Sequence, residues 1–287
     1  MFKKSIKKKA VILIYLVLSL ILIEGFQHYK ELKNIPKLIF ASSETSRIVP
    51  TIAPISTTPL ESFIAPILIY HYVEYVTDER DTIRKSLNIV PSIFERQVFT
   101  LQNAGYTFVT PKDIIDMLDG KLKLPQKPVV LSFDDGYRDF YTDVFPILKK
   151  YQAKAVAYIV SGFLDKPNYM FTWQLKEVAR SGLVEIGAHT VNHASLKGAP
   201  SHLAKYEIEE SKKELEKLLN IPIVSFAYPD GQFDESVAKL VEETGFTSAV
   251  TTIHGNIANQ RNKYFLYRIR PGHNVDNLLL NFLEKSE

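Results

Sequence analysis

Two short polar stretches of this sequence contain the residue types of a hydrolytic metal site. Asp134 and Asp135 come directly after the apolar, β-rich run Val129–Phe133. His189 and His193, four residues apart, follow a second apolar run. Two imidazoles and one carboxylate form a common ligand set for zinc in hydrolases, in which a further position stays open for water. The second carboxylate would then be free to accept a proton, so the two stretches together indicate a metal-dependent hydrolase.

The elements that must position these residues are short strands alternating with helices. Apolar runs rich in β-branched residues predict strands at 67–70, 107–109, 129–133, 155–160, 184–186, 223–228, 248–251 and 267–269. Between them, apolar residues at helical spacing predict helices, the longest from about 201 to 220. Alternation of this kind is typical of parallel strands with helices outside, and the sequence therefore predicts an α/β fold, a distorted (β/α) barrel of about seven units.

Polar residues follow several of the predicted strands. His71 follows the first strand, Asp134 the third, His189 the fifth and Asp230 the sixth. In β/α barrels the carboxyl ends of the strands meet at one mouth, where the chemistry takes place. We therefore expect these four strand ends to contribute to a single site.

The whole-chain composition excludes several other kinds of site. The chain has 287 residues and no cysteine, which excludes disulfides, thiolate metal ligands and cysteine nucleophiles. Its net charge is +3, but five lysines lie within the first nine residues, so the remainder carries a small net negative charge. No basic face for nucleic acid is implied.

The N-terminal residues predict a membrane anchor. The lysines lead into the uncharged apolar run 10–23, which is shorter than the roughly 20 residues of a full transmembrane helix. No small-x-small cleavage pattern follows, so residues 1–26 favour an uncleaved signal anchor over the alternative, a cleaved signal peptide. Both put the remainder outside the membrane, either anchored to it or secreted. Residues 27–64, with Ser, Thr and isolated prolines, predict a linker, and residues 65–287 predict the catalytic domain.

Three motifs resemble, in order, those of a known family. They are Ser132-Phe133-Asp134-Asp135-Gly136, His189-x-x-x-His193 and Tyr228-Pro229-Asp230-Gly231. They look like the first three motifs of the polysaccharide deacetylases with the NodB-homology fold, and the similarity extends from Pro66 to about His273. The early pair Tyr70-His71 is most similar to the extracellular poly-N-acetylglucosamine deacetylases. The resemblance implies a distorted barrel of about seven β/α units, which agrees with the predicted strands.

The resemblance implies a role for each motif residue. Asp135, His189 and His193 would bind one divalent metal, for which the imidazoles favour zinc, with cobalt and nickel left open. Asp134 would be the general base that takes a proton from water. The backbone N–H of Asp230 would donate to the oxyanion of the tetrahedral intermediate.

Histidines bound to a metal cannot protonate the departing amine, so the reaction needs another acid. The Tyr-His motif implies His71 as the general acid. His273 is the alternative, because many family members carry this histidine near the C-terminus. Many members also carry a base-orienting arginine at the position of Ala227. Arg268, in the last predicted strand, is the candidate replacement, and a surface arginine fits the sequence equally well.

Three aromatic residues are candidates for substrate binding. Tyr137 and Tyr228 could stack on sugar rings or serve only in packing. Trp173 could line the acetyl pocket, form a sugar platform, or be a buried aromatic at a helix start.

The resemblance implies a hydrolase that removes N-acetyl groups from an N-acetylglucosamine-containing polysaccharide at the cell surface or outside the cell. The partners expected are this polysaccharide and, through the N-terminal segment, the membrane, but no nucleic acid. An O-acetyl esterase on a glycan such as xylan is the enzymatic alternative. A catalytically silent glycan-binding surface module is the alternative from another class.

Overall fold

The structure, a computed structural model, describes residues 61–76, 78 and 80–285. The anchor expected over residues 1–26 and nearly all of the linker expected over 27–64 lie outside these residues and stay predictions. In the part of the chain that is described, no helix combines the length and the apolarity needed to cross a membrane.

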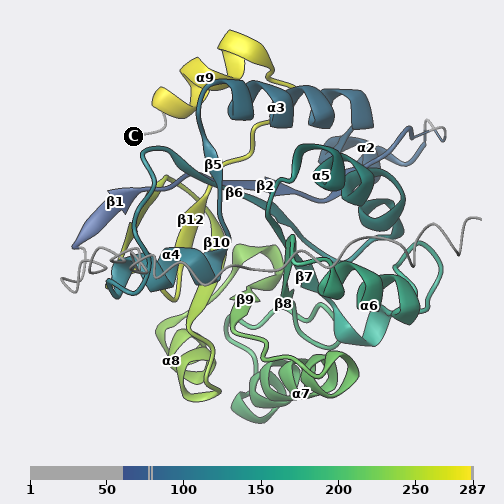
Figure 1. Cartoon of the computed structure of the whole chain (residues 1–287). Coiled ribbons are helices and arrows are strands. Elements are labelled where there is room, and N and C mark those ends of the chain that lie inside the picture. Colours follow the sequence, from purple (N-terminus) through teal and green to yellow (C-terminus); the bar gives the residue numbers. More distant parts are fainter. Residues whose placement is uncertain (1–60, 77, 79, 286–287) are drawn as a thin grey trace, which may run out of the picture. The chain divides into compact units, whose positions relative to one another are not determined.

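Seven parallel strands of the described region form a nearly closed barrel (Figure 1). In the order of their pairing they are β12 (Leu266–Arg268), β10 (Ser248–His254), β9 (Ser225–Ala227), β8 (Val184–Ala188), β7 (Ala155–Ile159), β6 (Pro128–Phe133) and β2 (Ile67–Tyr70), and β5 (Thr107–Phe108) pairs with β6. The end of β12 returns to β2, since the N–H of Ile69 donates to the carbonyl of Ile269 over 2.9 Å. The predicted barrel of about seven units is confirmed.

Helices lead the chain from one strand to the next, and most of them cover the outside of the barrel (Figure 1). They are α2 (Thr82–Leu87), α3 (Pro91–Asn103), α4 (Pro111–Leu118), α5 (Phe145–Tyr151), α6 (Thr172–Arg180), α7 (Ser201–Leu219), α8 (Glu235–Glu243) and α9 (Asp276–Glu284). Local sequence explains where several of them begin. Pro91 stands in the first turn of α3, where its missing N–H costs no hydrogen bond. Thr110 and Asp113 cap the start of α4 reciprocally.

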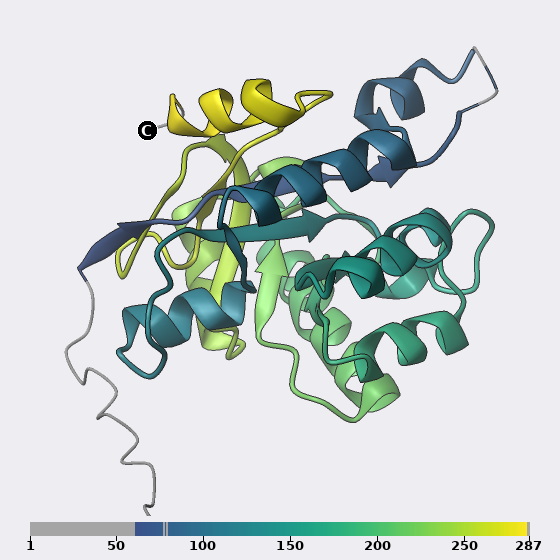
Figure 2. The same ribbon diagram turned by 45° about the horizontal axis from the view of Figure 1, so that its top comes forward.

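The last helix, α9, packs beside α3 near the junction of β2 and β12 (Figure 2). The Nε of Arg96 on α3 donates to the Oδ1 of Asp276 on α9 over 2.7 Å. The place where the barrel closes is therefore covered by helices from both ends of the described chain.

Both faces of the barrel wall are buried. Every residue of β2 and β6 is buried, as expected for parallel strands that are covered on both sides. Val130 and Val156 join a cluster that includes α4, whereas Leu131 and Ala157 join the cluster formed with α3, α5, α6 and α7. The strands are thus fixed by packing on both sides, and the candidate site residues occur where the strands end.

Several short elements were not predicted from the sequence. β1 (Ser62–Ile64) pairs antiparallel with β11 (Ile257–Asn259), and β3 (Tyr72–Val73) pairs with β4 (Asn88–Ile89). A π-helical turn, η1 (Phe140–Val144), leads into α5.

Candidate active site

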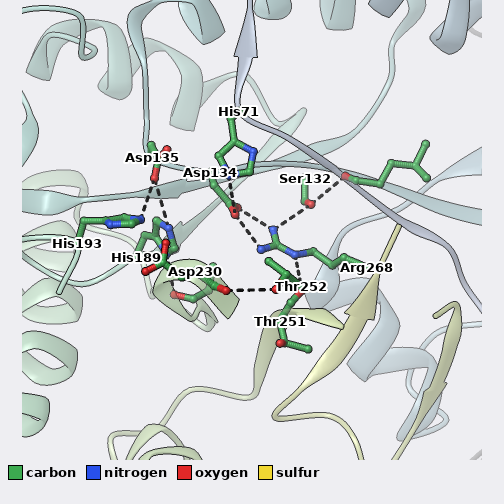
Figure 3. Close-up of polar contacts among 12 residues, drawn as sticks. His71, Ser132, Asp134, Asp135, His189, His193, Asp230, Thr251, Thr252 and Arg268 are labelled. Atoms are coloured by element: carbon green, nitrogen blue, oxygen red, sulfur yellow. Dashed lines mark hydrogen bonds and ion pairs between the residues drawn. The ribbon is translucent and has the colours of Figure 1, made fainter. Parts of the chain in front are cut away.

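Adjacent carboxylates at the end of β6 point in different directions (Figure 3). Asp135 has a φ of 73° and Gly136 a φ of 76°, so the chain enters the left-handed region as soon as the strand ends. Aspartate tolerates this conformation better than most residues, and glycine adopts it freely. The turn directs Asp134 toward the barrel interior and Asp135 toward the two histidines (Figure 3).

Asp135, His189 and His193 form a cluster whose ligand atoms all lie within 4.8 Å of one another. The Oδ1 of Asp135 lies 3.4 Å from the Nε2 of His189 and 3.4 Å from the Nε2 of His193. Ligands bound to zinc tetrahedrally at about 2.0–2.1 Å would be separated by roughly 3.3–3.4 Å. This Oδ1 is buried and has no hydrogen-bond partner in the described region. The spacing, the donor atoms and the unpartnered oxygen all fit a divalent metal.

The backbone of β9 orients the first histidine. The Nδ1 of His189 lies 2.7 Å from the carbonyl oxygen of Ala227. A carbonyl can only accept, so Nδ1 carries the proton and the lone pair on Nε2 faces the cluster. Burial lowers the pKa of His189, but the neighbouring carboxylates of Asp135 and Asp134 outweigh it, and the pKa lies above its usual value.

Arg268 of β12 forms a bidentate ion pair with Asp134. Its two terminal nitrogens donate to Oδ1 and Oδ2 over 2.7 and 2.8 Å, and its Nε donates to the carbonyl of Thr251 over 2.7 Å. Burial raises the pKa of Asp134, but Arg268 lowers it by more, so the pKa lies well below its usual range. Asp134 is therefore an ionised carboxylate with a fixed orientation.

His71 faces the same carboxylate from the end of β2 (Figure 3). Its Nε2 lies 4.0 Å from the Oδ2 of Asp134. Burial lowers the pKa of His71, and the charges of Asp134 and Asp135 oppose this shift only in part. The imidazole is therefore neutral at pH 7. His273, the alternative acid, is exposed in the turn after β12.

Asp230 lies in η3 (Pro229–Gly231), a tight turn that follows β9. Its φ is 58°, and its carbonyl accepts a hydrogen bond from the Oγ1 of Thr252 over 3.2 Å. A Cβ on Gly231 would lie 2.1 Å from the same Oγ1, so only glycine fits there. Figure 3 places Asp230 beside His189, and its assignment as the oxyanion donor stays a prediction.

The three candidate aromatic residues have different surroundings. Tyr137 stacks between Tyr72 and Tyr169, with ring centroids 3.9 and 5.1 Å away, and burial together with the charge of Asp135 raises its pKa. Tyr228 is fully buried and its hydroxyl donates to a backbone carbonyl, so its expected role in sugar stacking is corrected to packing. Trp173 is exposed at the start of α6, outside the cluster of catalytic candidates.

The sequence analysis did not identify the residues that contact Arg268 and Tyr137. Ser132 and Thr251 contact the Arg268 guanidinium, the former at 3.4 Å. Tyr72 and Tyr169 complete the aromatic stack around Tyr137. Tyr72 follows His71 directly, so its position after the first strand was an available signal, whereas nothing in the sequence marks Tyr169.

A nearly closed parallel barrel with a candidate Asp–His–His metal site and a separate buried carboxylate at its strand ends matches the deacetylase barrel. Residues 121–249 match the family model described as polysaccharide deacetylase. The chain is 32% identical over 205 residues to a protein of Bacillus subtilis (strain 168) named "Putative polysaccharide deacetylase YxkH", and the match covers 71% of this chain and 70% of YxkH. The chain belongs to the polysaccharide deacetylase family and is a deacetylase.

Two further deacetylases are similar to this chain. The poly-beta-1,6-N-acetyl-D-glucosamine N-deacetylase of Staphylococcus aureus (strain N315) is 27% identical over 198 residues, which cover 64% of this chain and 68% of that protein. The deacetylase PplD of Streptococcus pyogenes, solved in complex with acetate, is 31% identical with a TM-score of 0.69, and the similarity covers 80% of this chain and all of PplD.

Proposed function

We propose that this deacetylase removes N-acetyl groups from a polysaccharide that contains N-acetylglucosamine, in a metal-dependent reaction. The observation that carries the proposal is the ionised Asp134. It lies between the guanidinium of Arg268 and the imidazole of His71, and its neighbour in the sequence, Asp135, belongs to the candidate metal cluster. The name of the Staphylococcus aureus relative supports an amide rather than an ester as the bond that is cleaved.

Asp135, His189 and His193 would hold the metal, and zinc suits two imidazoles and one carboxylate. When bound, the metal supplies a Lewis acid that polarises the acetyl carbonyl and acidifies a water molecule. The hydrogen bond from His189 to Ala227 and the left-handed turn at Asp135 hold the ligand atoms in place before any ion binds. Preorganisation of this kind lowers the cost of binding.

Asp134 would take the proton from the attacking water. Each of its oxygens accepts one hydrogen bond from Arg268 and keeps a second lone pair. The same ion pair makes Asp134 a weak base, because its pKa is held low. Proton transfer to it is therefore efficient only from an acidified water, which explains why base and metal cluster lie next to each other.

His71 would deliver the proton to the departing amine. The imidazole is neutral at pH 7, so it must first receive the proton that Asp134 has taken. The distance of 4.0 Å between the Nε2 of His71 and the Oδ2 of Asp134 is longer than a direct hydrogen bond. Proton transfer between them therefore needs a small movement or a bridging water. Water adds to the carbonyl carbon, the C–N bond breaks as the relayed proton reaches the nitrogen, and the amine and acetic acid are formed. The proton of acetic acid then passes to the amine, so that acetate and a protonated amine leave. The N–H of Asp230 would stabilise the oxyanion between these steps.

Acetate release on defined oligosaccharides tests the proposal. We expect wild-type protein with stoichiometric metal to release acetate from β-1,6-linked N-acetylglucosamine oligomers, and Asp134→Asn to bind the metal but release at least a hundredfold less. Acetylated xylan is the comparison substrate for the esterase alternative. Stoichiometric metal without acetate release from any N-acetylated glycan would contradict the proposal.

A further inference from the structure

A groove lies on the outer surface of the barrel between α5 and α6. Its volume is about 680 Å³, within the range of small-molecule sites. Phe145, Lys149 and Gln152 line it from the side of α5, and Trp173, Glu177 and Arg180 line it from α6. None of the residues assigned to catalysis or metal binding contributes to its lining.

Trp173 presents its ring to this groove in a fixed orientation. It is the only tryptophan of the chain, and 57% of its surface is exposed. Its ring meets Tyr141 edge to face at 5.3 Å, and the hydroxyl of Tyr141 donates to Glu177 over 2.7 Å. An exposed aromatic ring that is held in this way offers contact area at a low cost in conformational entropy.

The polar residues around the ring include both donors and acceptors. Lys149 and Arg180 donate, Glu177 accepts, and the amide of Gln152 can do either. The charges nearly cancel, so the groove does not favour a strongly charged polymer. An aromatic face between mixed hydrogen-bonding groups suits a sugar, which has apolar C–H faces and a rim of hydroxyl and acetamido groups.

Trp173 lies at the end of the groove nearer the catalytic site, and from there the groove runs toward the opposite end of the barrel, where Gln152 and Leu183 precede β7 and β8. Trp173 is three residues beyond Met170, whose N–H donates to the carbonyl of Gly136 over 3.0 Å, and Gly136 follows the metal-ligand candidate Asp135. Three residues span at most about 10–11 Å. A glycan chain that leaves the catalytic site can therefore reach Trp173 within a few sugar units.

We propose that the α5–α6 groove binds sugar units of the polysaccharide beyond the unit that is deacetylated, with Trp173 as the stacking surface. This inference rests on the proposed function and adds a second attachment point for the polymer. Two attachment points on one molecule raise the effective concentration of the second, so long substrates gain affinity that short ones lack.

The single tryptophan makes the test direct, because its fluorescence reports on this groove alone. We expect a β-1,6-linked N-acetylglucosamine hexamer to change the emission of the full chain saturably. Trp173→Ala should raise KM for the hexamer about tenfold and affect the dimer much less. Tyr206→Ala, which removes an aromatic side chain of similar exposure on α7, is the matched control. It should change KM for neither the hexamer nor the dimer.

The outcomes separate this inference from the proposed function. If the hexamer is deacetylated but the emission stays constant, the groove does not bind the polysaccharide, and the proposed activity is unaffected. The same conclusion follows if Trp173→Ala keeps the wild-type KM. A hexamer that is neither deacetylated nor changes the emission overturns both.

A second observation concerns Glu207, a carboxylate of α7 that is 2% exposed. Its Oε2 accepts the backbone N–H groups of Val191 and Asn192, both over 2.9 Å, and its Oε1 accepts the side-chain amide of Asn192 over 2.9 Å. Val191 and Asn192 lie between the two histidines of the metal cluster. Glu207 therefore binds the loop that must bring His193 back toward His189.

This loop needs support because its backbone is strained. Thr190 has a φ of 65° and His193 a φ of 54°, a region that costs non-glycine residues about 1–2 kcal/mol each. From the opposite side the N–H of Gly162 donates to the carbonyl of Val191, which a Cβ on Gly162 would approach to 2.6 Å. The loop is thus held between a glycine and a buried carboxylate.

The geometry points to Glu207 as a positioning residue for the metal ligand His193. Competition for Zn²⁺ with a chelator measures the effect without reference to activity. We expect Glu207→Ala to weaken Zn²⁺ binding about 10- to 100-fold, the range seen when partners of metal ligands are removed. Glu207→Gln should restore most of the affinity, because a rotated Asn192 amide can pair with the glutamine amide.

Glu209→Ala is the matched control, since Glu209 is exposed on the same helix. It should leave Zn²⁺ affinity unchanged. If Glu207→Ala binds Zn²⁺ as tightly as the wild type, the positioning role is overturned. Should Glu207→Ala not fold, Asn192→Ala decides: it removes one of the three contacts, and unchanged affinity there overturns the role equally.

Discussion

Arg268 and Asp134 meet as a buried, bidentate ion pair although 134 residues separate them. Their side chains are 0% and 3% exposed, and the two N–O distances are 2.7 and 2.8 Å. Asp134 follows β6, whereas Arg268 ends β12, the strand that returns to β2. One contact therefore orients the carboxylate at the centre of the site and links strands across the barrel.

Arg268→Met removes the cation and leaves a buried carboxylate unpaired. Breaking a buried pair in this way costs about 3–5 kcal/mol, so the free energy of unfolding should fall by that amount at pH 8. Burial would then be opposed only by His189 and His71, so the pKa of Asp134 should rise. Urea denaturation at several pH values measures both effects, and the double variant Arg268→Met/Asp134→Asn should recover part of the lost stability. A single variant as stable as the wild type would show that the pair contributes nothing to folding.

Residues at strand ends were predictable because strand runs and polar motifs are both local. Asp134, Asp135, His189 and His193 each follow an apolar run, and the barrel brings them together as expected. The partner of Asp134 was not determined by any local pattern. A surface arginine and a buried one look alike in the sequence, and only the closure of the barrel decides between them.

Residues whose role depends on packing were predicted less well. Tyr228 belongs to a conspicuous motif, but its ring is stacked on Phe233 and buried. Glu207 lies in a helix rich in charged residues, next to the exposed Glu209, and looks like part of a solvated face. Its burial follows from which side of α7 faces the histidine loop, and this depends on tertiary contacts.

Removal of the metal should abolish activity and leave the barrel folded. The described core is apolar and does not depend on the cluster. We expect a chelator to stop acetate release and Asp135→Ala or His193→Ala to prevent Zn²⁺ binding. Zn²⁺ at 100 times its Kd should stabilise the wild type by about 2.7 kcal/mol and leave both variants unaffected, as thermal denaturation would record. His254→Ala, at an exposed histidine outside the cluster, is the control. Equal stabilisation of Asp135→Ala by Zn²⁺ would place the ion elsewhere.

Alanine substitutions at two glycines with nearly equal φ distinguish the effect of backbone strain from that of steric crowding. Gly231 has a φ of 70° and Gly198 a φ of 72°, so alanine is strained by about 1–2 kcal/mol at either position. A Cβ at Gly198 meets nothing within 4 Å, whereas at Gly231 it lies 2.1 Å from the Oγ1 of Thr252. Gly231→Ala should therefore be the more destabilised variant in urea denaturation. It should also lose activity, because it displaces Asp230, while Gly198→Ala keeps it. Equal loss of stability in the two variants would contradict the crowding at Gly231.

Asp139 should make the protein less stable as the pH rises. Burial raises the pKa of Asp139 to about 7 from its usual value of 3.8, although the N–H of Val73 donates to its carboxylate. Between these values the unfolded chain loses its proton and the folded chain keeps it, so the free energy of unfolding falls as the pH rises toward 7 and stays lowered above it.

Asp139→Asn removes this titration and keeps an oxygen that can accept from Val73. The variant should exceed the wild type in stability at pH 8 by roughly 2–4 kcal/mol, and the difference should shrink at pH 5, where the native aspartate is protonated. Urea denaturation of both proteins at the two pH values measures the change. A difference that is the same at pH 5 and pH 8 would mean that Asp139 is ionised in the folded protein at both, and that the hydrogen bond from Val73 outweighs its burial.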